Sequence, residues 1–217
     1  MKIFLDTANV AAVRKAQATG LLNGVTTNPS HVAKAGRVFE DVIEEICSLA
    51  LEHVSVEAVA DTAEGLVAEA RRLAAFGPQV VIKVPMTCEG LCAVPVLERE
   101  HHIRTNVTMV FSPTQALLAM KAGASFISIV LSRLENAAIE SDRLVDDTMV
   151  IKRQYGFVSE IIAGSVKTQP TLLSCLRAGV DIATIPEDLF NLMFEHPLTQ
   201  LGLAQFSKDW ESVQKRG

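Results

Sequence analysis

The chain has 217 residues, of which 49% are hydrophobic, and it carries a formal net charge of −5. This composition can bury a large core and is too apolar for a disordered chain, so we expect one compact domain over residues 1–217. Lysine and arginine are scattered, which argues against nucleic-acid binding. No apolar run approaches the roughly 20 residues that span a bilayer, and Asp6 comes too early for a signal peptide. We expect a soluble, cytoplasmic protein with no membrane partner.

Short β-branched runs alternate with longer helical patterns along the chain. The predicted strands cover residues 2–6, 24–28, 53–59, 79–84, 103–110, 126–131, 160–166 and 181–185. Helical patterns between them include 10–19, 39–51, 63–76, 90–100 and 113–121. Eight strand–helix units favour an α/β fold of the (β/α)8 TIM-barrel type. The alternative is a doubly wound open sheet, but no GxGxxG follows the first strand and no GxxxxGK[ST] occurs.

The last predicted segment is a C-terminal helical extension over residues 194–217. It carries Phe206 and Trp210 as apolar anchors. These side chains would pack across the barrel or on a neighbouring subunit.

The four cysteines, Cys47, Cys88, Cys92 and Cys175, match neither a disulfide framework nor a CxxC zinc site. We expect free thiols. Cys88 and Cys92 lie four apart on a predicted helix and could share a face, but two thiols alone make no metal site. We predict neither a metal nor a cofactor.

Lys83 lies within VVIKVP (80–85), the most β-branched run of the chain. Burying an ammonium group is costly, and desolvation favours a neutral amine, which can attack a carbonyl as a Schiff-base nucleophile. The alternative is a strand-end lysine whose stem packs while its head reaches water.

Polar side chains mark the end of nearly every predicted strand, where barrel enzymes place their catalytic groups. These residues are Asp6, Thr26, Asn28, Glu57, Lys83, Asn106, Thr108, Ser128, Arg133, Ser165, Lys167 and Thr184. Their convergence in a barrel predicts a site, with Asp6 and Glu57 as its acid–base candidates. The histidines fall in loops or strand starts, and we interpret them as surface or cap residues: His31, His53, His101, His102 and His196.

Arg133, Ser165 and Lys167 suggest an anion pocket. Guanidinium and ammonium groups pair with phosphate, and the SVKT turn (165–168) opens a helix whose free N–H groups favour anions.

Several motifs resemble the transaldolase family, in its short subgroup that also contains fructose-6-phosphate aldolases. They are FLDTA (4–8), GVTTNPS (24–30), IKVPMT (82–87), TNVT (105–108) with Phe111-Ser112, and HPL (196–198). The resemblance implies a Schiff-base lysine on strand four, which matches Lys83. It implies that Asp6 is the acid/base at the hydroxyl of the carbon being cleaved. Glu57 and Thr108 would hold the water that shuttles protons.

The same resemblance implies roles in substrate binding. Asn28, Asn106 and Ser128 are expected to orient the substrate's hydroxyls and its dihydroxyacetone unit, and we also expect Thr26 to bind the substrate. The sugar phosphate would be held by Arg133, Ser165 and Lys167.

The chain also departs from the family pattern. Where the family commonly reads SPFVGR, this chain reads SIVLSR (128–133), so Val130 replaces an aromatic residue. Aldolase members tend to carry Tyr there and Gln at the position of Glu57, whereas transaldolases carry Phe and Glu. Glu57 therefore favours group transfer and Val130 favours neither. Lys167 replaces a frequent arginine and loses its bidentate geometry.

These observations predict a transaldolase of the pentose phosphate pathway that moves a dihydroxyacetone unit from fructose 6-phosphate or sedoheptulose 7-phosphate to an aldose phosphate. One alternative is an aldolase-type lyase that releases dihydroxyacetone and glyceraldehyde 3-phosphate. Another is a non-catalytic barrel that binds sugar phosphates. By the resemblance, we also expect a ring-forming homo-oligomer, a pentamer or decamer, assembled through the C-terminal helix.

Overall fold

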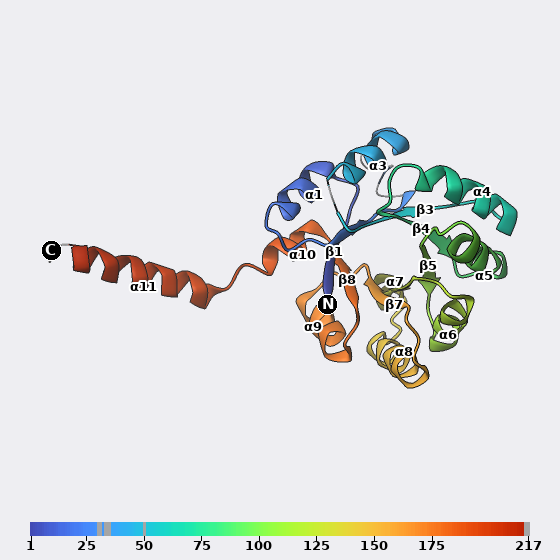
Figure 1. Cartoon of the computed structure of the whole chain (residues 1–217). Coiled ribbons are helices and arrows are strands. Elements are labelled where there is room, and N and C mark those ends of the chain that lie inside the picture. Colours follow the sequence, from blue (N-terminus) through green and yellow to red (C-terminus); the bar gives the residue numbers. More distant parts are fainter. Residues whose placement is uncertain (30–31, 33–35, 50, 215–217) are drawn as a thin grey trace.

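Eight parallel strands close into a barrel surrounded by helices (Figure 1). The computed structural model describes residues 1–29, 32, 36–49 and 51–214. Each strand pairs with the next along the chain, and β8 pairs back with β1. The strands are β1 (Lys2–Asp6), β2 (Gly24–Thr26), β3 (His53–Glu57), β4 (Val80–Pro85), β5 (Thr105–Val110), β6 (Phe126–Val130), β7 (Glu160–Gly164) and β8 (Ile182–Ile185). The closed barrel confirms the predicted fold and excludes the open sheet.

The helices follow the strands in the predicted alternation. They are α1 (Val10–Gln17), α3 (Phe39–Cys47), α4 (Ala63–Ala74), α5 (Cys88–Pro95), α6 (Pro113–Ala122), α7 (Leu131–Asn136), α8 (Asp142–Tyr155), α9 (Gln169–Ala178), α10 (Glu187–Leu192) and α11 (Pro197–Gln214). A π-helical turn, Val96–Glu100, continues α5. The predicted end of the sixth strand was wrong by one residue, because Leu131 begins α7.

The strands keep a period of two that separates the barrel interior from the helix layer. On β4, Val80, Ile82 and Val84 belong to the main core between barrel and helices. The alternate residue Val81 belongs to a second cluster with Phe4, Phe126, Ile162 and Ile182. Lys83 follows Val81 on the same face. The interior is therefore apolar near the amino ends of the strands and polar near their carboxyl ends.

His53 lies at the amino end of this interior, so its interpretation as a surface or cap residue was wrong. Its exposed fraction is 2%. Its ring lies 4.6 Å from that of Phe4 and 4.5 Å from that of Phe126, between centroids. Gly24 makes room for these rings, because a Cβ there would lie 2.9 Å from Phe4 Cε1 and 2.6 Å from the carbonyl oxygen of His53. His53 is the first residue of β3. It points into the barrel because alternate residues of a strand share one face, and Ser55 and Glu57 on that face point inward.

The other histidines differ from His53. His102 and His196 are exposed and His101 is half-buried. His31 lies outside the described residues, as do Ser30 of the GVTTNPS motif and residues 215–217 of the predicted extension.

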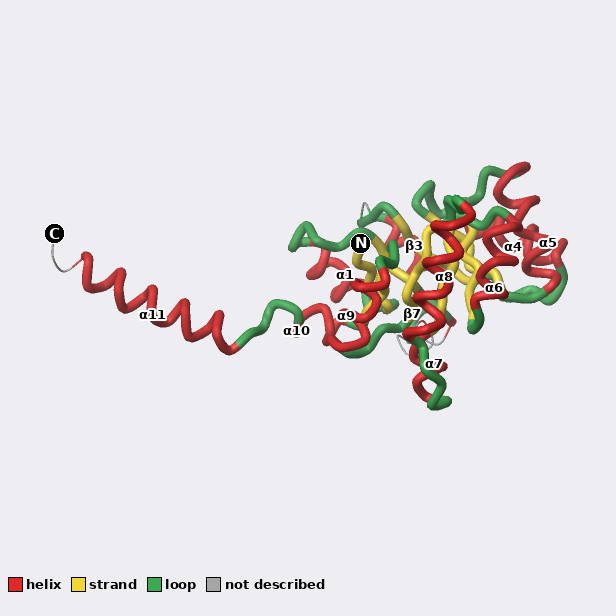
Figure 2. The backbone as a smooth tube through the Cα atoms, turned by 90° about the horizontal axis from the view of Figure 1, so that it is seen from below, coloured by secondary structure: helices red, strands yellow, loops and turns green. Residues whose placement is uncertain are grey.

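The final helix, α11, projects away from the barrel (Figures 1 and 2). It buries none of its residues. It therefore does not cross the barrel in this structure. Among the described helices, none has both the length and the apolar character needed to cross a membrane.

Candidate active site

A cavity of about 530 Å³ opens at the carboxyl ends of the strands. Its lining residues come from every strand or the segment that follows it: Asp6, Thr26, Asn28, Pro29, Glu57, Lys83, Thr108, Met109, Ser128, Val130, Ser132, Arg133, Asn136, Gly164, Ser165 and Thr184. Nine of the eleven residues predicted to be catalytic or substrate-binding line this cavity, and the other two are Asn106 and Lys167. The barrel thus brings together residues that lie up to 178 positions apart in the sequence, from Asp6 to Thr184.

Lys83 lines this cavity with an exposed fraction of 8%. Its Nζ donates to Glu57 Oε2 at 3.3 Å and to the carbonyl oxygen of Thr27 at 3.1 Å. Parallel register sets Glu57 directly beside Lys83 on β3 and β4. The side chain of Thr27 bonds the Ser55 carbonyl at 2.8 Å, which anchors the segment that carries the acceptor for Lys83. The amine is therefore buried, oriented and adjacent to a carboxylate that can exchange a proton with it.

Asp6 belongs to a second polar group, which Thr26 and Thr184 complete. Thr26 Oγ1 donates to Asp6 Oδ1 at 3.0 Å and lies 2.6 Å from Thr184 Oγ1. Thr26 and Thr184 are nearly fully buried. These contacts hold the Asp6 carboxylate at the cavity wall, where it can accept a proton from a bound hydroxyl group.

Asn106 and Ser128 form the third polar group. Ser128 Oγ donates to Asn106 Oδ1 at 2.9 Å, and Asn106 Nδ2 donates to Ser55 Oγ at 3.3 Å. Ser128 lines the cavity, whereas Asn106 is completely buried and lies outside the lining among the described residues. Asn106 therefore supports the cavity floor through Ser128.

The predicted anion residues are placed differently from one another. Arg133, on α7, and Ser165, after β7, both line the cavity. Ser165 has a φ of 58°, an uncommon left-handed conformation that recurs in binding loops. Lys167 is exposed and is not part of the described lining. Its charge can act on this site only from a distance.

Several lining residues were not predicted from the sequence. Met109 has a φ of 63° within β5, where the register with β6 shifts between Val107 and Val110. This irregularity turns Met109 into the cavity, and no sequence pattern signals it. Asn136 could have been found, because it lies one helical turn after Arg133 on α7. Ser132 and Gly164 also line the cavity.

The cysteines lie outside the described lining and are free thiols, as predicted. Burial raises the pKa of Cys47 to about 11 and that of Cys175 to about 12, so both are inert thiols at neutral pH. Cys88 and Cys92 are exposed on α5. Among the described residues, no group of three or more His, Cys, Asp or Glu side chains could hold a metal ion.

A closed parallel barrel with a buried amine and two carboxylates in one cavity at the strand ends has the architecture of a (β/α)8-barrel enzyme. The sequence matches the family described as transaldolase/fructose-6-phosphate aldolase over residues 3–217. The chain therefore belongs to this family, which confirms the resemblance noted in the motifs.

Relatives align with the chain over its whole length. A "probable transaldolase" from Aquifex aeolicus is 49% identical over 216 residues, covering 100% of this chain and 99% of the relative. One from Methanococcus maripaludis is 47% identical, with 100% of both chains covered. A solved thiamine phosphate pyrophosphorylase from Pyrococcus furiosus has a TM-score of 0.57 at 16% identity, covering 85% of each chain. That likeness shows the fold alone.

Proposed function

We propose that the chain is a transaldolase that carries a dihydroxyacetone unit as a Schiff base on Lys83. One observation carries the proposal: the buried Lys83 amine contacts Glu57 in the same cavity that Asp6 lines. A barrel that only bound sugar phosphates would have no use for a buried amine paired in this way.

The proposed reaction begins at the C2 carbonyl of a ketose phosphate. Lys83 gives a proton to Glu57, its amine adds to this carbon, and further protons pass through Glu57 and a water held by Glu57 and Thr108. The carbinolamine then loses its oxygen as water and leaves an iminium ion. Asp6 takes the proton of the C4 hydroxyl, the C3–C4 bond breaks, and the aldose phosphate departs as an aldehyde. The electrons of that bond form an enamine on Lys83.

Other lining residues bind the substrate in this proposal. Ser128, Asn28 and Thr26 orient the hydroxyl groups, with Asn106 acting through Ser128. Arg133 and Ser165 hold the phosphate, because both line the cavity and a guanidinium group pairs with phosphate oxygens. Lys167 adds a weaker, screened attraction for the anion.

Borohydride trapping tests the covalent step. The protein is incubated with fructose 6-phosphate and borohydride, and modified peptides are mapped by mass spectrometry. We expect a reduced adduct on Lys83, and none in Lys83→Arg, which keeps a positive charge beside Glu57. Bound substrate with no adduct on Lys83 would refute the mechanism and favour a non-catalytic binding barrel.

The fate of the enamine separates transferase from lyase. It either attacks an acceptor aldose phosphate or takes a proton and hydrolyses to dihydroxyacetone. Glu57 and the names of the relatives favour transfer. Val130, an aliphatic lining residue, leaves lyase activity as the second candidate. Turnover of fructose 6-phosphate should depend on added erythrose 4-phosphate; equally fast cleavage without it would assign the lyase.

We also infer a homo-oligomer in which α11 of one protomer packs on another. Leu203, Phe206, Trp210 and Val213 recur at i, i+3, i+7 and i+10, so they share one helix face. Each is at least 59% exposed in the protomer. An apolar stripe of this size on an isolated helix is typical of a subunit contact.

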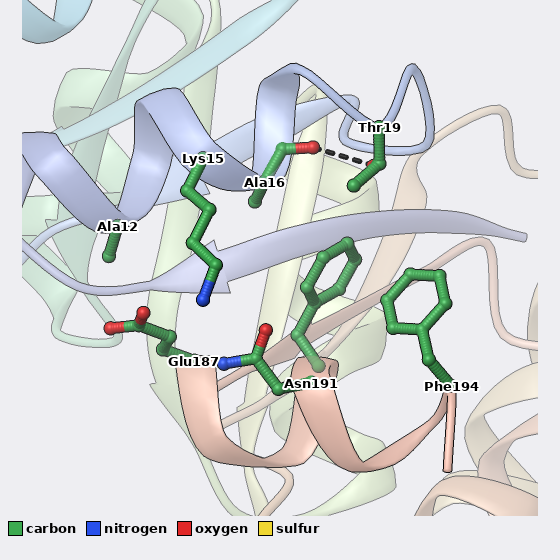
Figure 3. Close-up of a pocket in the computed structure, with 8 residues that line it drawn as sticks. Ala12, Lys15, Ala16, Thr19, Glu187, Asn191 and Phe194 are labelled. Atoms are coloured by element: carbon green, nitrogen blue, oxygen red, sulfur yellow. Dashed lines mark hydrogen bonds between the residues drawn. The ribbon is translucent and has the colours of Figure 1, made fainter.

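A groove near the base of α11 is the surface that we assign to the partner's helix (Figure 3). It has a volume of about 190 Å³ and lies between α1 and α10. The lining residues are Ala12, Lys15, Ala16, Thr19, Glu187, Phe190, Asn191 and Phe194. The rings of Phe190 and Phe194 meet edge to face at 5.3 Å between centroids. An aromatic wall with Lys15 and Glu187 in the same groove suits the apolar face of a helix that also carries charged residues.

A further inference from the structure

A chain of hydrogen bonds runs through the barrel interior from its amino end to the cavity floor. Ser128 Oγ donates to Asn106 Oδ1 at 2.9 Å, and Asn106 Nδ2 donates to Ser55 Oγ at 3.3 Å. Ser55 Oγ lies 2.5 Å from His53 Nε2. Three of the four side chains are at most 2% exposed and Ser128 is 5% exposed. His53 is thus linked to a cavity-lining residue, although its ring packs among phenylalanines away from the cavity.

The donors and acceptors of this hydrogen-bond series give the series a direction. Ser55 Oγ already accepts the Asn106 amide proton, so its own hydroxyl proton needs an acceptor, and the described part of the chain places His53 Nε2 within reach of it. His53 can accept there only as a neutral ring with its proton on Nδ1. The Ser128 hydroxyl proton then points to Asn106, and lone pairs of Ser128 Oγ face the cavity.

The surroundings of His53 favour this neutral ring. Burial lowers its pKa well below the usual value, and the positive charges of Arg104 and Lys2 lower it further. Nδ1 has no hydrogen-bond partner among the described residues. Phe4 and Phe126 flank the ring.

We infer that His53 is a positioning residue. It sets the direction of the hydrogen bonds from Ser55 to Ser128 and makes Ser128 a hydrogen-bond acceptor toward the substrate. The inference rests on the proposed function for its consequence. Ser128 Oγ can then accept a hydrogen bond from a donor group of the substrate, such as a hydroxyl of the dihydroxyacetone unit. With the proton on Nε2 instead, the Asn106 amide would turn over and Ser128 would present its own proton to the cavity.

The first test reads the ring of His53 without any substrate. Protein labelled with ¹⁵N in histidine is measured by solid-state NMR at neutral pH, and His53→Gln identifies the His53 signals. We expect a neutral ring protonated on Nδ1. A ring protonated on Nε2, or on both nitrogens, would overturn the inference, and neither result depends on catalytic activity.

The second test asks whether His53 acts through Ser128. His53→Leu removes the terminal acceptor and should raise KM for fructose 6-phosphate about threefold to tenfold, the size expected for one hydrogen bond. In a Ser128→Ala background, the same change should add little, because the link to substrate is already lost. Full additivity would assign His53 a role in folding alone. His53→Gln, which keeps an acceptor near the Nε2 position, should restore most of the wild-type KM.

Discussion

Single side chains at the strand ends differ in the step that they would serve. Lys83 and Glu57 form one contact pair, while Asp6 is held by Thr26 in a separate group. The proposal therefore separates imine formation, at Lys83 and Glu57, from carbon–carbon cleavage, at Asp6. Variants can separate the two steps as well.

Asp6→Asn should block cleavage and leave imine formation intact. Asparagine keeps an Oδ1 that accepts from Thr26, but it cannot take the proton of the C4 hydroxyl. We expect kcat to fall by a factor of about 10² to 10⁴, the usual contribution of a general base. Borohydride should still trap the ketose on Lys83 of this variant. Loss of the adduct together with turnover would contradict the separate role of Asp6.

His53 should make the protein less stable in mild acid. Its pKa is lowered in the folded state, whereas the unfolded chain has the ordinary value of about 6.5. Below that pH the unfolded state binds the extra proton, so the free energy of unfolding falls as pH falls, by up to about 1.4 kcal/mol per pH unit. Above about pH 6.5 this contribution is constant.

Urea unfolding of the wild type and of His53→Gln at several pH values between about 5 and 7.5 measures this effect. The carboxylates titrate in both proteins, so their contribution cancels in the difference. The wild type should lose stability relative to the variant as the pH falls. A difference that does not change with pH would show that His53 does not titrate on unfolding.

Strand elements were the best predicted part of the fold. Their β-branched runs and alternation identified all eight strands, and β1 was predicted with its observed bounds. Other boundaries moved by a few residues, as for β2, which ends at Thr26. The register shift at Met109 was not predictable, because it depends on how β5 meets β6.

The packing of β2 against its neighbours makes Gly24 sensitive to substitution. In Gly24→Ala, the new methyl would meet the backbone oxygen of His53 at 2.6 Å, and a backbone atom cannot move aside cheaply. We expect the free energy of unfolding to fall by about 1–3 kcal/mol in urea titrations. Gly202→Ala, in the exposed helix α11 with nothing within 4 Å of the new Cβ, is the control and should leave stability equal or slightly higher. Equal stability of both variants would show that the strands can shift.

At the scale of the whole molecule, the position of α11 predicts association. Light scattering after size exclusion should give a mass that is a multiple of the 23.5 kDa chain. The double variant Phe206→Ser/Trp210→Ser should shift that mass toward the single chain, as should Asn191→Arg in the groove. Lys208→Ser, on the opposite face of α11, is the matched control. A wild type that runs as a single chain would refute the oligomer, and an unchanged double variant would refute the contact.

Composition, periodicity and motifs were sufficient to determine the barrel class, the family and most of the cavity-lining residues. They suffice because strand alternation and strand-end chemistry are local properties of the chain. Only the tertiary structure placed Asn106 beneath the floor, left Lys167 outside the lining and buried His53 between two phenylalanine rings. These features depend on the register between strands and on which residues become neighbours when the barrel closes. Local sequence patterns determine neither the register nor these neighbours.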